Sequence, residues 1–221
     1  MNLNKKLSDI LDPNKIEVVK NPIEKAHGLP NECYLNNDYL EFEKEKIFKN
    51  NWTMIGVASS VPNPGDAKPF NLLGIPILIV RNKENEVKVF HNVCSHRGFK
   101  LVDQECKLKN VIRCPYHSWS YDFNGKLTVT PHIGGLGKHE VEGFDKNNSN
   151  LKEIKSNIWM DLIFININSN AKPFKHFIKP LEDRWSKFIS KKDQKLIRHS
   201  TDNGYFNMTV NSNWKFAIEN Y

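Results

Sequence analysis

The sequence predicts a mainly β fold, an antiparallel barrel or sandwich, with a helix before it and the beginning of an α+β region after it. Between positions 51 and 168, short runs of β-branched and aromatic residues alternate with turn residues. The pair Asn124-Gly125 is typical of a tight hairpin. After Pro173 the apolar residues recur with a helical period instead. We therefore expect three regions: 1–50, 51–168 and 169–221.

The first region is expected to hold one helix. Residues 1–36 are polar and contain Pro13, Pro22 and Pro30, so an irregular extension is predicted there. Asn37 and Asp38 are residues that often cap a helix N-terminus. The apolar residues that follow lie on one helical stripe and predict a helix over 38–50: Tyr39, Leu40, Ile47 and Phe48.

The central region is expected to consist of short antiparallel strands. Lys83-Glu84-Asn85 and Phe123-Asn124-Gly125-Lys126 mark hairpin turns within it. Strands spaced this closely predict a small barrel or sandwich. The predicted strands cover 52–58, 67–73, 75–81, 86–91, 151–155 and 158–167.

The last region is expected to mix helix and strand. A strand is predicted over 204–210, and Asn213 is expected to cap a helix that begins at Trp214. One face of that helix is apolar and predicts a covering partner. An earlier helical stripe comprises Phe177, Leu181, Trp185 and Phe188.

Composition excludes several classes of protein. With 39% hydrophobic and 26% charged residues, the chain is expected to be globular, not disordered. The longest apolar run, 72–80, is interrupted by Gly74 and Pro76 and is too short to span a membrane. No signal peptide follows Met1, so we expect a cytoplasmic protein without a membrane partner.

The formal net charge of +7 allows two interpretations. A nucleic-acid-binding protein can be this basic. Here, however, the lysines are spread along the chain, with only a modest cluster over 187–198, so no nucleic-acid partner is expected. A solvated lysine-rich surface is favoured, and a docking surface for an acidic electron donor is its functional alternative.

Two short motifs combine cysteine with histidine. They are Cys94-Ser95-His96 and Cys114-Pro115-Tyr116-His117, separated by residues 97–113. Each motif offers one thiolate and one neutral imidazole. Such a set can divide between the two irons of a [2Fe–2S] cluster, with both cysteines on one iron and both histidines on the other, as in a Rieske centre. We expect Cys94, His96, Cys114 and His117 to be the metal and cofactor ligands.

Zinc is the alternative for the same residues. Two Cys and two His suit a structural zinc site, but zinc motifs usually group like ligands, and each group here is mixed. The motifs also extend well beyond their ligands, which favours the cluster. The remaining cysteines, Cys33 and Cys106, are expected to be free thiols.

The chain resembles the N-terminal half of the large (α) subunit of Rieske non-haem iron ring-hydroxylating oxygenases. The resemblance is carried by 90–98, which contains the first motif, and by 113–121, which contains the second. It extends to Pro64-Gly65-Asp66, to 159–165 and to Asn213-Trp214-Lys215 with Glu219-Asn220. It implies a Rieske [2Fe–2S] domain over 51–168 and, over 169–221, the incomplete start of an α+β helix-grip catalytic domain.

The resemblance also implies a function. In the family, the Rieske domain passes electrons to a mononuclear Fe(II) that two histidines and a carboxylate hold. Those ligands are expected beyond Tyr221, so the sequence identifies no catalytic residue. The 221 residues alone are expected to be inactive, and the Fe(II) is expected only in a full-length protein. That protein would oxidise a small organic substrate with O₂, as a mono- or dioxygenase; aromatic rings and quaternary amines both remain open.

Partners and an alternative follow from the same resemblance. A reductase or ferredoxin is implied as the electron donor, and a homotrimer as the full-length assembly. The alternative function is a stand-alone Rieske ferredoxin-like electron carrier. Such a carrier needs only about 100 residues, whereas this chain has 221. The oxygenase subunit is therefore the favoured interpretation.

Residues around the ligands have expected roles as well. Arg97 and Trp119 are expected to pack and hydrogen-bond around the cluster. Tyr116 and Ser118 are candidates to donate hydrogen bonds toward its sulfurs. In the family's respiratory relatives two loop cysteines form a disulfide, and the places that look equivalent here hold Phe99 and Tyr116, which implies a low reduction potential. The glycine-rich segment between His132 and His139 is expected to be a flexible loop beside the cluster.

Overall fold

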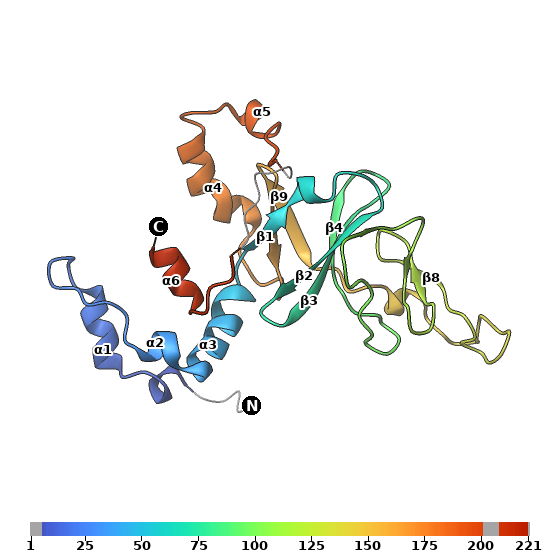
Figure 1. Cartoon of the computed structure of the whole chain (residues 1–221), viewed down its shortest axis with the longest axis horizontal. Helices are drawn as coiled ribbons and strands as arrows, with labels where there is room; N and C mark the ends of the chain where they lie inside the picture. The colour runs from blue at the N-terminus through green and yellow to red at the C-terminus, as the bar shows by residue number, and fades with distance from the viewer. Residues whose placement is uncertain (1–5, 201–207, 221) are drawn as a thin grey trace. The chain divides into compact units, whose positions relative to one another are not determined.

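A computed structural model describes residues 6–200 and 208–220 of the chain (Figure 1). It divides into two compact units. The first combines Met1–Asn50 with Phe206–Tyr221, and the second is Asn51–Tyr205. Within the described residues, no helix has the length and apolar character needed to cross a membrane.

The first unit is helical. Its helices are α1 (Pro13–Glu17), α2 (Glu32–Leu35), α3 (Asn37–Glu43) and α6 (Trp214–Glu219). The predicted helix over 38–50 is confirmed as α3 with a π-helical turn over Lys44–Phe48. Its N-cap, however, is Asn36, whose side chain accepts hydrogen bonds from the amides of Asp38 and Tyr39. The expectation that 1–36 is irregular was wrong at α1 and α2. The Asp12-Pro13 pair was an available signal, because Asp caps α1 and Pro suits a first helical turn.

A buried ion pair organises the first unit. Lys215 donates to both oxygens of Glu43 at 2.8 and 2.9 Å, and both side chains are almost fully buried. The Lys215 ammonium also lies 5.2–5.4 Å from the ring centroids of Tyr34, Tyr39 and Trp214. Asn213 caps α6, as predicted. The predicted apolar face of this helix is wrong in detail, because Lys215 is its buried residue and Ile218 is 67% exposed.

The second unit contains three antiparallel sheets (Figure 1). The mainly β prediction is confirmed, but among the described residues the sheets stay separate and form no closed barrel. One sheet is β1 (Thr53–Val57), β10 (Leu162–Asn166) and β9 (Lys155–Trp159), in that spatial order. The second is β4 (Val87–His91), β3 (Ile75–Arg81), β2 (Asp66–Leu72) and β5 (Cys106–Lys107). The third is β6 (Ile112–Arg113), β7 (Ser120–Tyr121) and β8 (Leu127–Val129).

Strand β3 is shared by two hydrophobic cores. Leu78 and Val80 lie in a core with the residues of the two Cys/His motifs. Ile77 and Ile79 lie in a second core with strands β1 and β10. Because successive side chains of a strand point to opposite faces, an uninterrupted apolar run is what a strand buried on both sides requires.

The two predicted hairpin turns are confirmed, and the structure adds a third. Gly125 takes a φ of 81° in the turn between β7 and β8, and Asn85 takes 63° between β3 and β4. The predicted strands over 151–155 and 158–167 were wrong in their bounds, because β9 and β10 turn at Met160 and Asp161. Both turn residues have positive φ, 49° and 69°, without a glycine to signal the turn.

The helices after the sheets are α4 (Phe174–Trp185) and α5 (Lys191–Gln194). The helix predicted after Pro173 is therefore confirmed. Its predicted stripe, however, remains 40–77% exposed from Phe177 to Phe188, and Ile178 is the residue that packs against Trp52 and Phe164. The strand predicted over 204–210 lies mostly outside the described residues, and 208–210 have no regular structure.

Asn92 holds the segment behind the first motif. Its side chain accepts from the amides of Leu101 and Val102 and donates to the Val102 carbonyl at 2.7 Å, and the residue is fully buried. Asn92→Leu would leave three buried backbone groups unpaired, so we expect unfolding free energy to fall by about 3 kcal/mol or more. Urea denaturation measures this. Asn71→Leu, at an exposed asparagine with one backbone contact, is the control and should cost far less; equal losses would contradict the role of Asn92.

Candidate metal centre

The two Cys/His motifs fold into loops with the same hydrogen bonds. In the first loop, the Cys94 amide donates to the Phe99 carbonyl at 2.8 Å and the Gly98 amide donates to the Cys94 carbonyl at 3.0 Å. In the second loop, the Cys114 amide donates to the Trp119 carbonyl at 2.8 Å and the Ser118 amide donates to the Cys114 carbonyl at 3.0 Å. Gly98 and Ser118 are both left-handed, with φ of 68° and 59°. Each loop thus turns back on its own cysteine.

The two cysteines meet inside the core. Cys94 and Cys114 are each 2% exposed, and no disulfide joins them. Burial raises the pKa of the Cys94 thiol, and the neighbouring Cys114 thiol raises it further through a hydrogen bond and its charge. The hydrogen bond with Tyr121 acts in the opposite direction. Two thiols paired in an apolar interior become stable thiolates when a metal binds them.

The two histidines lie together nearer the surface. The ring centroids of His96 and His117 are 4.9 Å apart. His96 stacks on the Trp119 indole at 4.5 Å with an angle of 9° between the rings, whereas His117 is exposed beside Tyr116. Burial lowers the pKa of His96, and the charges of His117 and Arg97 lower it further. A cavity of about 520 Å³ opens against both imidazoles.

The donor atoms fit a two-iron cluster. The Nδ1 atom of His96 is buried and has no hydrogen-bond partner within the described part of the chain, as expected of a nitrogen that awaits a metal. No three His, Cys, Asp or Glu side chains of the described residues converge on one ion. The structure instead presents a thiol pair and an imidazole pair, which matches the division of ligands between two irons.

Tyr121 is a residue of this site that the sequence analysis missed. Its hydroxyl lies 3.2 Å from Cys94 Sγ and 2.8 Å from Ser95 Oγ. Ser95 donates its own proton to the Ser149 carbonyl at 2.6 Å. A metal-bound Cys94 thiolate has no proton to give, so in that state Tyr121 would be the donor to Cys94. Burial raises the pKa of Tyr121 and keeps that proton in place. The available signal was its position two residues after Trp119, on the inward face of β7.

The other expected neighbours have different places. Trp119 packs on His96, as predicted. Tyr116 is 57% exposed and packs at a tilt against His117 and Phe99. Arg97 is exposed. His132 and His139 lie in one loop with ring centroids 5.1 Å apart, and His132 lines the cavity beside the motif histidines.

Replacing Tyr121 by Phe should lower the reduction potential of the centre. A hydrogen bond to a ligand sulfur stabilises the more negative, reduced state. Its loss is expected to shift the midpoint by about −60 mV, which for one electron corresponds to about 1.4 kcal/mol. Protein-film voltammetry measures the shift, and Tyr116→Phe is the matched control that should leave the potential unchanged. An unaltered midpoint in Tyr121→Phe would contradict the assigned hydrogen bond.

Comparison with protein families identifies the region of the two loops. Residues 51–141 match the Rieske [2Fe-2S] domain. The match contains both motifs and strands β1 to β8, whereas β9 and β10 follow it. The site is therefore a Rieske centre, and its cofactor is a [2Fe–2S] cluster.

Similarity to individual proteins extends over most of the chain. It is 32% identical over 197 residues to the carnitine monooxygenase oxygenase subunit of Acinetobacter pittii, covering 89% of this chain and 50% of that protein. It is 26% identical over 194 residues to the glycine betaine monooxygenase oxygenase subunit of Chromohalobacter salexigens, covering 88% and 41%. The chain thus spans about half the length of the curated relatives it matches.

A solved structure shows the same fold. The apo form of the quaternary ammonium Rieske monooxygenase CntA superposes with a TM-score of 0.66 at 32% identity, covering 73% of this chain and 46% of that one. The sequence match and the structural match are thus both to Rieske-type monooxygenases of quaternary ammonium compounds.

Proposed function

We propose, since the chain belongs to the large (α) subunits of the Rieske oxygenases, that it is the electron-transferring part of such an oxygenase. The ligands proposed for its cluster are Cys94, His96, Cys114 and His117. The observation that carries this proposal is the buried thiol pair beside a surface imidazole pair in two loops of the same design. Residues 51–168 are proposed as the Rieske domain, 1–50 as an extension and 169–221 as the beginning of the catalytic domain.

The side chains of the site divide the work of holding and shielding the cofactor. When bound, the cluster accepts and releases one electron at a time. Cys94 and Cys114 would hold it from the dry side of the core, where water cannot reach their sulfurs. His96 and His117 would hold it from the surface side, closest to a partner that gives or takes the electron. Trp119 covers His96, and the Tyr121 hydroxyl, 3.2 Å from Cys94 Sγ, would donate a hydrogen bond to the metal-bound thiolate.

The activity of the whole protein is proposed from its relatives. The electron would pass to a mononuclear iron that oxidises a small organic substrate with O₂, and the 221 residues alone would be inactive. A quaternary ammonium compound is the favoured substrate class, because the carnitine and glycine betaine enzymes are similar over most of this chain. A reductase or ferredoxin is proposed as the donor and a trimer as the assembly, in the cytoplasm. The solved relative CntA is described as transferring electrons between subunits.

Anaerobic reconstitution with iron and sulfide tests the ligand assignment. We expect two irons and two labile sulfides per chain, and pulsed EPR of protein labelled with ¹⁵N-histidine should show two coupled nitrogens. Neither Phe99 nor Tyr116 can form a loop disulfide, so the midpoint should lie near the lower end of the roughly −150 to +300 mV range of Rieske centres. Stoichiometric zinc without sulfide, or coupling to no histidine, would contradict the proposal.

A further inference from the structure

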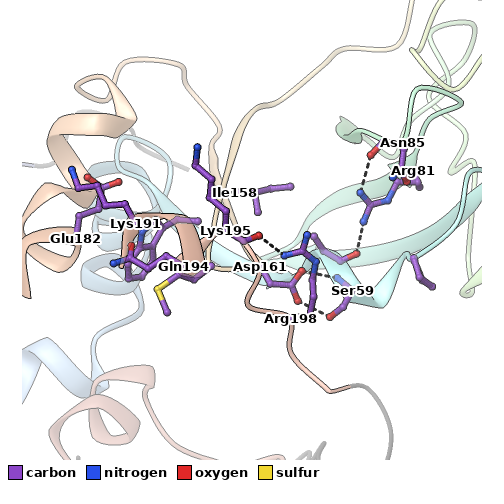
Figure 2. A pocket seen from close by; sticks show the side chains of 14 residues that line it. Ser59, Arg81, Asn85, Ile158, Asp161, Glu182, Lys191, Gln194, Lys195 and Arg198 are labelled. Carbon is purple, nitrogen blue, oxygen red and sulfur yellow. Dashed lines mark hydrogen bonds between the residues drawn. The ribbon is translucent and has the colours of Figure 1, made fainter. Parts of the chain in front are cut away.

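A second cavity lies in the 51–205 unit, and none of its lining residues belongs to the two cluster loops. Its volume is about 660 Å³, and Figure 2 shows the side chains that line it. One wall is the corner after β1 and the turn between β9 and β10, and Arg81 at the end of β3 contributes to it. The opposite wall is α5 and the residues that follow it. The charged side chains that line it are Arg81, Asp161, Glu182, Lys191, Lys195 and Arg198.

Cations outnumber carboxylates in this cavity, and they are unpaired. In the described part of the chain, no salt bridge involves Arg81, Arg198 or the two cavity lysines, whereas Lys107, Lys146 and Lys179 elsewhere each pair with a carboxylate. Four cations and two carboxylates leave an excess of two positive charges. Lys191, Lys195 and Arg198 are exposed and Arg81 is half-buried, so these cations are accessible to an anion from solution.

The nearest carboxylate is engaged elsewhere. Asp161 is buried and accepts hydrogen bonds from the Ser59 amide at 3.1 Å and the Ser59 hydroxyl at 2.6 Å (Figure 2). It also accepts one from the His199 amide at 2.9 Å. These contacts fix the segment after α5 to the corner after β1. Asp161 therefore serves the architecture of the cavity and forms no hydrogen bond with Arg81 or Arg198 in the described structure.

Two of the cations are fixed by backbone carbonyls. Arg81 donates to the carbonyls of Ala58, Val61 and Asn85 at 2.7–3.0 Å. Arg198 donates to the carbonyls of Lys195 and Ile197. Carbonyls orient a guanidinium without neutralising its charge, and each guanidinium has five N–H groups, so both retain donors for a ligand. Burial lowers the pKa of Arg81; the charge of Asp161 opposes this, and that of Arg198 adds to it.

Part of the wall is apolar. Ile158, Trp159 and Met160 line the cavity together. The indole N–H of Trp159 is buried and has no hydrogen-bond partner in the part of the chain that the structure describes. A buried donor without an acceptor is uncommon in native structures. The cavity thus combines unpaired cations with an apolar surface, and the buried indole N–H belongs to one of its lining residues.

We propose that this cavity binds a phosphorylated small molecule through a phosphate or diphosphate group held by Arg81, Lys191, Lys195 and Arg198. Guanidinium and ammonium groups are the usual partners of phosphate oxygens. A group with at least two negative charges would balance the excess of positive charge. The cavity is larger than a phosphate needs, and its apolar wall has room for an organic part such as a nucleoside.

Isothermal titration calorimetry on the 221-residue chain with its cluster tests the proposal at constant ionic strength. The probes are sodium diphosphate, ADP and, as a neutral control, adenosine. Diphosphate and ADP are expected to bind, with adenosine binding at least tenfold more weakly. Equal affinities for diphosphate and ADP would support a site for the phosphates alone. Tighter ADP binding would support contact with the nucleoside too. Absence of binding by both anions at millimolar concentration would overturn the proposal.

A matched set of variants separates a site from general attraction to a basic protein. Lys195→Gln and Arg198→Gln should each weaken diphosphate binding about tenfold. Lys192→Gln removes one charge from the same helix at an exposed residue that does not line the cavity, and it should change affinity less than twofold. Equal losses in all three variants would refute a specific site. The visible spectrum of the cluster reports that each variant remains folded.

Discussion

A Cys114→Ser variant is expected to lose its cluster completely and to melt at a much lower temperature than the parent protein. Cys114 is 2% exposed and lies beside Cys94, so no water or other side chain can replace its sulfur. A hydroxyl is a poor ligand for iron in such a cluster, and metal binding contributes directly to folding free energy. Iron and sulfide analysis, the visible spectrum and thermal unfolding by circular dichroism measure the effect.

The same chain offers a matched control for this variant. Cys106 is an exposed cysteine on β5, outside both loops. Cys106→Ser should keep two irons per chain and an unchanged melting temperature. If Cys114→Ser kept a full complement of iron and sulfide, the ligand assignment would be wrong. If both variants lost the cluster, sensitivity of the fold to any cysteine substitution would be the better explanation.

Gly65→Ala is expected to destabilise the protein by about 3 kcal/mol or more. Gly65 has a φ of 89°, and a Cβ atom there would lie 2.5 Å from the Leu108 carbonyl oxygen. That carbonyl belongs to a backbone that cannot retreat easily, because the Leu108 amide donates to the Gly65 carbonyl at 2.8 Å. The substitution would therefore separate the segment after β5 from the start of β2. Urea denaturation gives the change in unfolding free energy.

Gly74→Ala separates the clash from the backbone strain. Gly74 has nearly the same φ, 90°, but an added Cβ would meet nothing within 4 Å. This control should cost only the about 1–2 kcal/mol of a left-handed alanine. Equal losses at Gly65 and Gly74 would show that strain alone, and not the contact with Leu108, decides the effect.

Local signals explain which parts of the fold could be predicted. The strands around β3 and the turn at Asn124-Gly125 follow from apolar runs bounded by turn residues. The turn at Met160 and Asp161 lacks such a signal, because Asp161 is held in its left-handed conformation by contacts with Ser59, which lies 102 residues away. Long-range hydrogen bonds of this kind cannot be read from a local window.

In the candidate site, too, local motifs predict some residues and long-range contacts decide others. Its four proposed ligands are apparent from two short motifs, since their residue types and spacing carry the chemistry. The contact of Tyr121 with Cys94 depends on how β7 packs behind that cysteine, and the sequence motifs predict Tyr116 and Ser118 for this role instead. Lys215 is similar: helical periodicity predicts an apolar face for α6, and only a partner as remote as Glu43 makes a buried lysine acceptable.

Strand β3 contributes alternate side chains to both hydrophobic cores. The metal centre and the β1–β10–β9 sheet are therefore expected to unfold together, as one cooperative unit. Opening either core would expose one face of β3 and loosen the strand that the other core needs. Opening motions of β3 that would admit oxidants to the cysteine sulfurs are therefore opposed by the packing of the other core as well. Protection of the cofactor against oxidative damage is in this way a property of the whole 51–205 unit, not of its two loops alone.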